Sequence, residues 1–136
     1  MKVLGIDWGV KRLGLALSDD LGKMAFEYQV LDNWDNEDVI DYLRNLTALD
    51  GIEKIVVGLP KHMNGEDSDS TQDAREFGAM LENCLDVEVI FEDERMTTKM
   101  VDNILKEMNI SQKEVAKRKD MVAAKYILQS YLDREK

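Results

Sequence analysis

Hydrophobic and polar positions alternate over the first third of the chain, which is typical of β-strands that bury one face. The clearest alternation is at 12–18, where leucines alternate with small residues. A hydrophobic run at 3–8 precedes it, and another run follows at 24–31. The connections at 9–11 and 19–22 are short and contain glycine, which favours tight turns. We therefore predict three consecutive strands paired as an antiparallel meander.

The rest of the chain alternates between helical and strand patterns. Apolar residues recur at helical spacing in four segments, and two short apolar runs predict further strands. The predicted helices span 36–49, 70–85, 97–108 and 120–132, and the predicted strands span 52–57 and 87–91. Strands joined through a helix pair in parallel. The expected fold is a single α/β domain over residues 1–136. It contains a mixed five-stranded sheet, first three strands antiparallel and last two parallel, flanked by helices.

Composition narrows the class of protein. The chain has 136 residues and no stretch near the roughly 20 apolar residues that a membrane span requires. Cys84 is the only cysteine and His62 the only histidine. These counts exclude an internal disulfide, thiolate zinc sites and clusters of imidazole ligands. We expect a cytoplasmic protein without a membrane partner.

The net charge of −10 is unevenly distributed. Residues 19–92 hold 19 acidic and 5 basic side chains, whereas the segments on either side hold more bases than acids. Net negative charge opposes binding to a phosphate backbone, but local basic segments favour it. A nucleic-acid partner is therefore compatible with the two ends of the chain.

Carboxylates stand at the ends of three predicted core elements. Asp7 closes the first strand, Asp93 and Glu94 follow the fifth, and Asp120 opens the last helix on the face that packs on the sheet. Acids brought together repel one another unless a cation joins them, and Mg²⁺ or Mn²⁺ prefers oxygen ligands. Two such ions about 4 Å apart support phosphodiester hydrolysis. We predict that Asp7 is a metal ligand and that Asp93, Glu94 and Asp120 converge with it.

Basic residues lie beside each of these acids. They follow Asp7 and Glu94 and precede Asp120, so a phosphate backbone would find positive charge around the carboxylates. Thr97 or Thr98 is predicted to cap the following helix, whose free backbone N–H groups can bind phosphate. The predicted nucleic-acid contacts are Lys11, Arg12, Arg95, Thr97, Thr98, Lys117, Arg118 and Lys119.

Four segments resemble, in order and spacing, the motifs of the YqgF (RuvX) family. They are "GIDWGVKRLGLALSD", "KIVVGLPKHMNGEDS", "FEDERMTTKMV" and "KDMVAAKYILQSYLD". The family is described as Holliday junction resolvases and as pre-16S rRNA nucleases with a ribonuclease H-like fold. The resemblance implies a metal-dependent endonuclease whose functional acids are Asp7, Asp93 or Glu94, and Asp120. Asp93 and Glu94 point to opposite faces of a regular strand, and we favour Glu94, whose side chain is longer. The metal ligands implied are then Asp7, Glu94 and Asp120.

The resemblance is not complete at the fourth strand. Related junction resolvases carry an acid at the end of that strand, whereas this chain has Gly58 there. An acid from the fifth strand is expected to take its place.

The sequence leaves alternatives open. The substrate is either ribosomal RNA precursor, at the 5′ end of pre-16S rRNA, or branched DNA such as a Holliday junction. Junction cutting would require a homodimer, because the substrate has two-fold symmetry. A non-catalytic nucleic-acid-binding or ribosome-biogenesis factor is the second class of function, favoured by the high negative charge.

Overall fold

A single five-stranded sheet forms the centre of the computed structural model, which describes residues 1–62, 64–94 and 97–135, without the side chains of 97, 98 and 117. The strands are β1 (Val3–Asp7), β2 (Arg12–Ser18), β3 (Ala25–Asp32), β4 (Lys54–Leu59) and β5 (Glu88–Asp93). Their order is β3-β2-β1-β4-β5. The β1, β2 and β3 pairings are antiparallel, and β1–β4 and β4–β5 are parallel. The predicted mixed sheet is confirmed.

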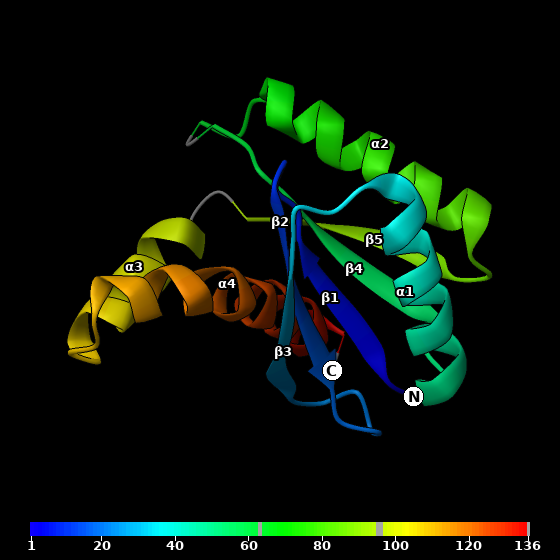
Figure 1. Ribbon diagram of the computed structural model, residues 1–136, viewed down its shortest axis with the longest axis horizontal. Helices are drawn as coiled ribbons and strands as arrows, with labels where there is room; N and C mark the ends of the chain where they lie inside the picture. Colours follow the sequence, from blue (N-terminus) through cyan, green and yellow to red (C-terminus); the bar gives the residue numbers. More distant parts are fainter. Residues whose placement is uncertain (63, 95–96, 136) are drawn as a thin grey trace.

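Helices cover both faces of this sheet. They are α1 (Asn36–Asp50), α2 (Asp69–Cys84), α3 (Thr97–Glu107) and α4 (Gln112–Arg134). Figure 1 shows α1 and α2 on one face and α4 crossing the other. None of the described helices is long and apolar enough to cross a bilayer.

Alternation along β1 explains the two layers. Successive strand side chains point to opposite faces, so Leu4 and Ile6 join the core under α1 and α2. Val3 instead packs with Leu128 of α4. Asp7 is in phase with Val3, and this parity places it on the α4 face.

The closing helix begins earlier than predicted. It starts at Gln112, so Asp120 lies within α4 and does not open it. Ser111 is the N-cap, and its Oγ accepts a hydrogen bond of 3.1 Å from the backbone N–H of Glu114. The residues between are mostly strong helix formers with little apolar periodicity, which explains the wrong prediction.

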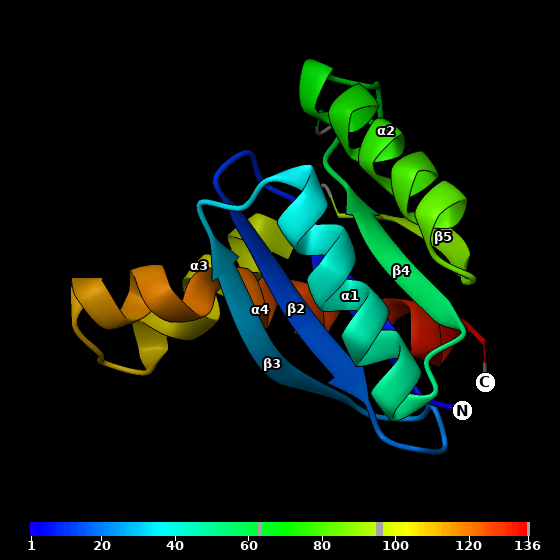
Figure 2. The same ribbon diagram turned by 45° about the vertical axis from the view of Figure 1, so that its right-hand side comes forward.

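The first half of α4 packs on α3 and not on the middle of the sheet. Val101 and Leu105 of α3 are buried against Val122 and Ala123 of α4. In both ribbon views this pair of helices extends past the free edge of β3 (Figures 1 and 2). The arrangement holds the basic segment before Asp120 beside β3, where Lys113 lines a hollow with Arg12 and Asp32.

Two glycines let α4 lie directly on the sheet. A Cβ at Gly5 would lie 2.7 Å from Leu128 Cβ, and one at Gly14 would collide with the backbone carbonyl of Asp120. Because the obstacle at Gly14 is backbone, no side-chain rotation can relieve it. Gly14 therefore fixes the height of Asp120 above β2.

We expect Gly14→Ala to lower the free energy of unfolding by at least about 2 kcal/mol, because it forces α4 away from β2. Gly51→Ala is the control: its Cβ would meet nothing within 4 Å, but its φ of +65° costs about 1 kcal/mol in a non-glycine residue. Chemical denaturation of both variants measures the difference. Equal losses would contradict close packing at Gly14.

Candidate functional site

Two carboxyl groups meet at the carboxyl end of the parallel strands, one from each of the two strands that flank β4. Asp7 ends β1, and Glu94 follows the last residue of β5. The backbone N–H of Glu94 donates to the carbonyl of Leu59 at 3.1 Å, which continues the ladder beyond β5. The Glu94 side chain extends over β4, where a Cβ at Gly58 would lie 2.5 Å from Oε2. It ends in hydrogen-bond contact with the carboxyl of Asp7.

This contact places an acid in the position predicted from the resemblance. Gly58 leaves empty the space at the end of β4, and Glu94 from the neighbouring strand fills it. Asp93 is exposed at the end of β5 and affects Glu94 through its negative charge. The geometry favours Glu94 over Asp93 as the partner of Asp7.

Burial raises the pKa values of both members of this pair. Burial is the largest cause of the raised pKa of Asp7, followed by the charge of Glu94 and the hydrogen bond with it, and then the charge of Asp120. Burial also raises the pKa of Glu94, to about 7, while its hydrogen bond with Asp7 lowers it. The pair therefore keeps a proton near neutral pH, because two ionised carboxylates in contact are too costly.

Asp120 reaches this region from the helix above. It lies over Gly14, which is the cross-strand neighbour of Asp7. Its Oδ2 is 3.0 Å from Nε of Arg12, an ion pair that does not meet hydrogen-bond geometry. Burial raises the pKa of Asp120, and the positive charges of Arg12 and Lys119 lower it. Asp120 is thus close enough to influence Asp7 but is turned toward an arginine.

The ion pair with Arg12 turns Asp120, one of the three predicted metal ligands, toward the guanidinium. Among the described residues, no three Asp, Glu, His or Cys side chains are grouped as a metal site would require. Asp7 and Glu94 are brought together, and Asp120 stands beside them with its carboxylate on Arg12. The assignment of all three as ligands stays a prediction.

Most described bases of the predicted nucleic-acid surface are held by acids. Arg118 pairs with Glu27 at 3.2 Å, and Lys119 pairs with Asp102 at 3.1 Å. Lys11 has no ion pair within the part of the chain that the structure describes. The side chains of four further predicted contacts lie outside the described residues: Arg95, Thr97, Thr98 and Lys117.

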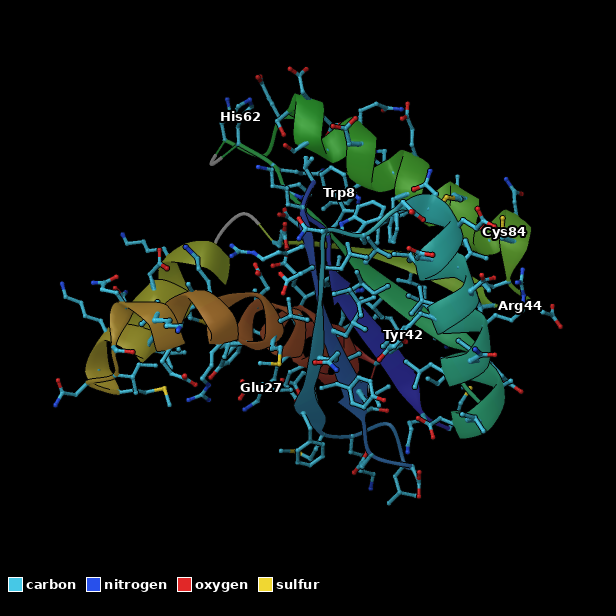
Figure 3. All side chains as sticks on the ribbon, in the orientation of Figure 1. Trp8, Glu27, Tyr42, Arg44, His62 and Cys84 are labelled. Carbon is cyan, nitrogen blue, oxygen red and sulfur yellow. The ribbon has the colours of Figure 1, made fainter. Side chains whose placement is uncertain are left out.

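A hollow beside Asp120 opens between the β1–β2 loop and α4. Its lining is Gly9, Val10, Lys11, Arg12, Asp32, Asn33 and Asp120. The loop is fixed from behind, because Nε1 of Trp34 donates to the carbonyl of Gly9 at 2.9 Å. In Figure 3, Trp8 marks the same end of the sheet, one residue after Asp7. The hollow is therefore a pre-shaped polar surface next to the carboxyl pair.

The sequence analysis missed two lining residues of this region. Asp32, the last residue of β3, pairs in register with Arg12 and lies in the hollow. Lys113, in the first turn of α4, lines an adjoining hollow with Arg12 and Asp32. Only the strand register and the early start of α4 could have revealed them.

The carboxyl pair fits a divalent cation. Burial disfavours ionisation of both carboxyls, and two ionised carboxylates in contact repel each other, so a bound cation would remove this cost. Mg²⁺ and Mn²⁺ are held by one or two carboxylates, with water and substrate oxygens as the remaining ligands. Asp7 and Glu94 satisfy that requirement, and the negative charge of Asp120 acts on Asp7 from α4.

Comparison with known proteins gives a consistent family signal. The sequence profile described as "RuvX: Holliday junction resolvase" matches residues 1–134. A Clostridium botulinum protein named "Putative pre-16S rRNA nuclease" is 40% identical over 134 residues, covering 98% of each chain. A protein of the same name from Syntrophomonas wolfei is 37% identical, covering 98% of this chain and 94% of its own.

Solved structures agree on the fold. The structure "T. thermophilus RuvC in complex with Holliday junction substrate" matches with a TM-score of 0.61 at 15% identity. The match covers 99% of this chain and 96% of that chain. The Fowlpox virus resolvase, in complex with Holliday junction DNA, matches with a TM-score of 0.60 at 13% identity, covering 99% of each chain. At these identities the likeness concerns the fold.

The raised pKa of Glu94 predicts a stability that falls as pH rises. Between its ordinary value of 4.5 and its folded value of about 7, the folded protein holds a proton that the unfolded chain has released. The free energy of unfolding of the metal-free protein should therefore fall through this window, by up to about 1.4 kcal/mol per pH unit. Glu94→Gln should make the profile less steep and leave the part due to Asp7, whose pKa burial also raises, whereas the exposed control Glu53→Gln should not change the slope. Denaturation in chelator at several pH values tests this; identical profiles for the two variants would contradict it.

Proposed function

The chain belongs to the RuvX family of Holliday junction resolvases, and from this premise we propose that it is a metal-dependent nuclease of structured nucleic acid. The observation that carries the proposal is the buried contact between the carboxyls of Asp7 and Glu94 at the edge of the sheet. Such a pair is costly as a purely structural feature, because burial disfavours its charge, and among the described residues only the more distant charge of Lys119 favours ionisation of Asp7. It is well suited to holding a divalent cation.

Asp7, Glu94 and Asp120 would hold Mg²⁺ or Mn²⁺, as two ions in the working complex. The ions supply an activated water and stabilise the leaving oxygen in phosphodiester hydrolysis. The chain itself provides an ordered anionic edge: Glu94 is fixed by its backbone bond to Leu59, and Asp120 by the contact of α4 with Gly14. Asp93 contributes negative charge beside Glu94.

The basic residues around this edge would hold the phosphates of the substrate. Lys11 and Arg12 line the hollow beside Asp120, and Lys113 extends the positive surface along α4. Arg95, Lys117, Arg118 and Lys119 complete the proposed contacts, with the backbone N–H groups at the start of α3, around Thr97 and Thr98. Surface ion pairs such as Lys119–Asp102 are weak enough to exchange for phosphate.

We propose ribosomal RNA precursor as the substrate, with cleavage at the 5′ end of pre-16S rRNA, in the cytoplasm. Relatives that are 37–40% identical over nearly the whole chain are named for that activity. The second candidate substrate is a Holliday junction, which the family description names and which a homodimer would be needed to cut. The alternative is a non-catalytic role in ribosome biogenesis, and a cleavage assay distinguishes it from a nuclease.

Asp7→Asn should abolish cleavage while leaving the fold intact. The amide keeps a hydrogen bond to Glu94 and removes a charge, so the metal-free variant should gain about 1 kcal/mol of stability at pH 8. The assay offers a pre-16S rRNA fragment and a four-way DNA junction, each with Mn²⁺, Mg²⁺ or chelator. Glu53→Gln controls for loss of one negative charge at an exposed position.

Three results would contradict the proposal. Cleavage by Asp7→Asn would remove Asp7 from the site. Unfolding of that variant would make Asp7 structural. Failure of the wild-type chain to cut either substrate with metal present would favour the non-catalytic alternative.

Binding should weaken steeply as salt concentration rises, because released counterions drive phosphate contacts. With uncut substrate on the Asp7→Asn background, Lys119→Gln should reduce the slope of log affinity against log salt by about 1. Lys23→Gln removes the same charge in the turn between β2 and β3, at the opposite end of β2, and should leave the slope unchanged. Filter binding at several salt concentrations measures both. A slope insensitive to Lys119 would exclude it from the contact surface.

A further inference from the structure

Asp120, the third ligand of the proposed metal site, is paired with Arg12 in the resting protein. Nε of Arg12 stands 3.0 Å from Oδ2 of Asp120. The arginine side chain is 47% exposed, whereas the Asp120 side chain is 18% exposed. Arg12 can therefore leave into solvent, but Asp120 is held by the contact of its backbone with Gly14.

Arg12 has a second acid within the same hollow. Asp32 is its register partner on β3, and both residues line the two adjoining hollows beside α4. Asp32 also affects Asp120 directly, since its negative charge raises the pKa of Asp120. A guanidinium displaced from Asp120 would thus remain next to a carboxylate and within reach of an incoming phosphate.

We infer that Arg12 is a positioning residue that withholds Asp120 from the metal site until a substrate phosphate draws its guanidinium away. This inference rests on the proposed function, since it concerns how that site becomes complete. In the resting protein Arg12 competes with a divalent cation for the Asp120 carboxylate. Phosphate bound in the hollow takes the guanidinium as a bidentate partner, and Asp120 turns toward Asp7 and Glu94. Metal and nucleic acid would then strengthen each other's binding.

The test is Mn²⁺ affinity without nucleic acid, measured at pH 8 from the electron paramagnetic resonance signal of free Mn²⁺. Arg12→Gln should bind Mn²⁺ about three- to fivefold more tightly than wild type, the size of a partly exposed ion pair. Arg12→Lys keeps the charge and should stay close to wild type. Thermal unfolding of each variant confirms that it is folded before titration.

Two comparisons separate this mechanism from a general loss of positive charge. Lys11→Gln removes one charge in the same hollow, where Lys11 has no ion pair among the described residues, and should raise Mn²⁺ affinity less than Arg12→Gln. In an Asp120→Asn background, Arg12→Gln should change Mn²⁺ affinity no more than Lys11→Gln does. This double-mutant cycle isolates the pairwise effect.

The outcomes distinguish the inference from the function it rests on. If wild type binds Mn²⁺ but Arg12→Gln gains no more affinity than Lys11→Gln, the inference is overturned and the proposed metal site stands. If the gain persists in the Asp120→Asn background, Arg12 does not act through Asp120, and the inference is again overturned. If neither wild type nor Arg12→Gln binds Mn²⁺, the proposed metal site fails together with the inference.

Discussion

Two carboxyl groups buried in contact at the edge of a sheet are the constraint on which this structure depends. Burial raises the pKa of both carboxyls, so it is costly for Asp7 and Glu94 to be ionised together there without nearby positive charge. Nothing in the hydrophobic core requires either acid. The contact between the two acids costs free energy in the folded protein, and we interpret it as a feature that a cation-binding site requires.

The packing around the pair shows how the chain makes room for it. Gly58 lets the side chain of Glu94 cross β4, and Gly14 lets α4 bring Asp120 down onto β2. Both are positions where a side chain would fill space that a carboxylate or its helix now occupies. The ion pair with Arg12 partly balances the charge of Asp120, the third acid of the proposed site.

Sequence periodicity was sufficient for the architecture but not for the details of the site. Alternation in β2 and helical spacing elsewhere predicted the mixed sheet, because the face that an element buries determines the spacing of its apolar residues. The first half of α4 escaped prediction because it packs on α3, away from the main core, and its basic residues hide the apolar period. The choice between Asp93 and Glu94 depended on side-chain parity beyond the end of β5. Asp32 could not be anticipated, since its place beside Arg12 follows from the register of β2 and β3.

The central claim is that the Asp7–Glu94 pair exchanges its proton for a divalent cation. Crystals grown at pH 8 with Mn²⁺ would test it through anomalous scattering at the manganese absorption edge. We expect a strong anomalous peak between the carboxylates of Asp7 and Glu94, with the two groups no longer hydrogen-bonded to each other. An intact hydrogen bond between the two carboxyls, with no peak beside them at saturating Mn²⁺, would contradict it.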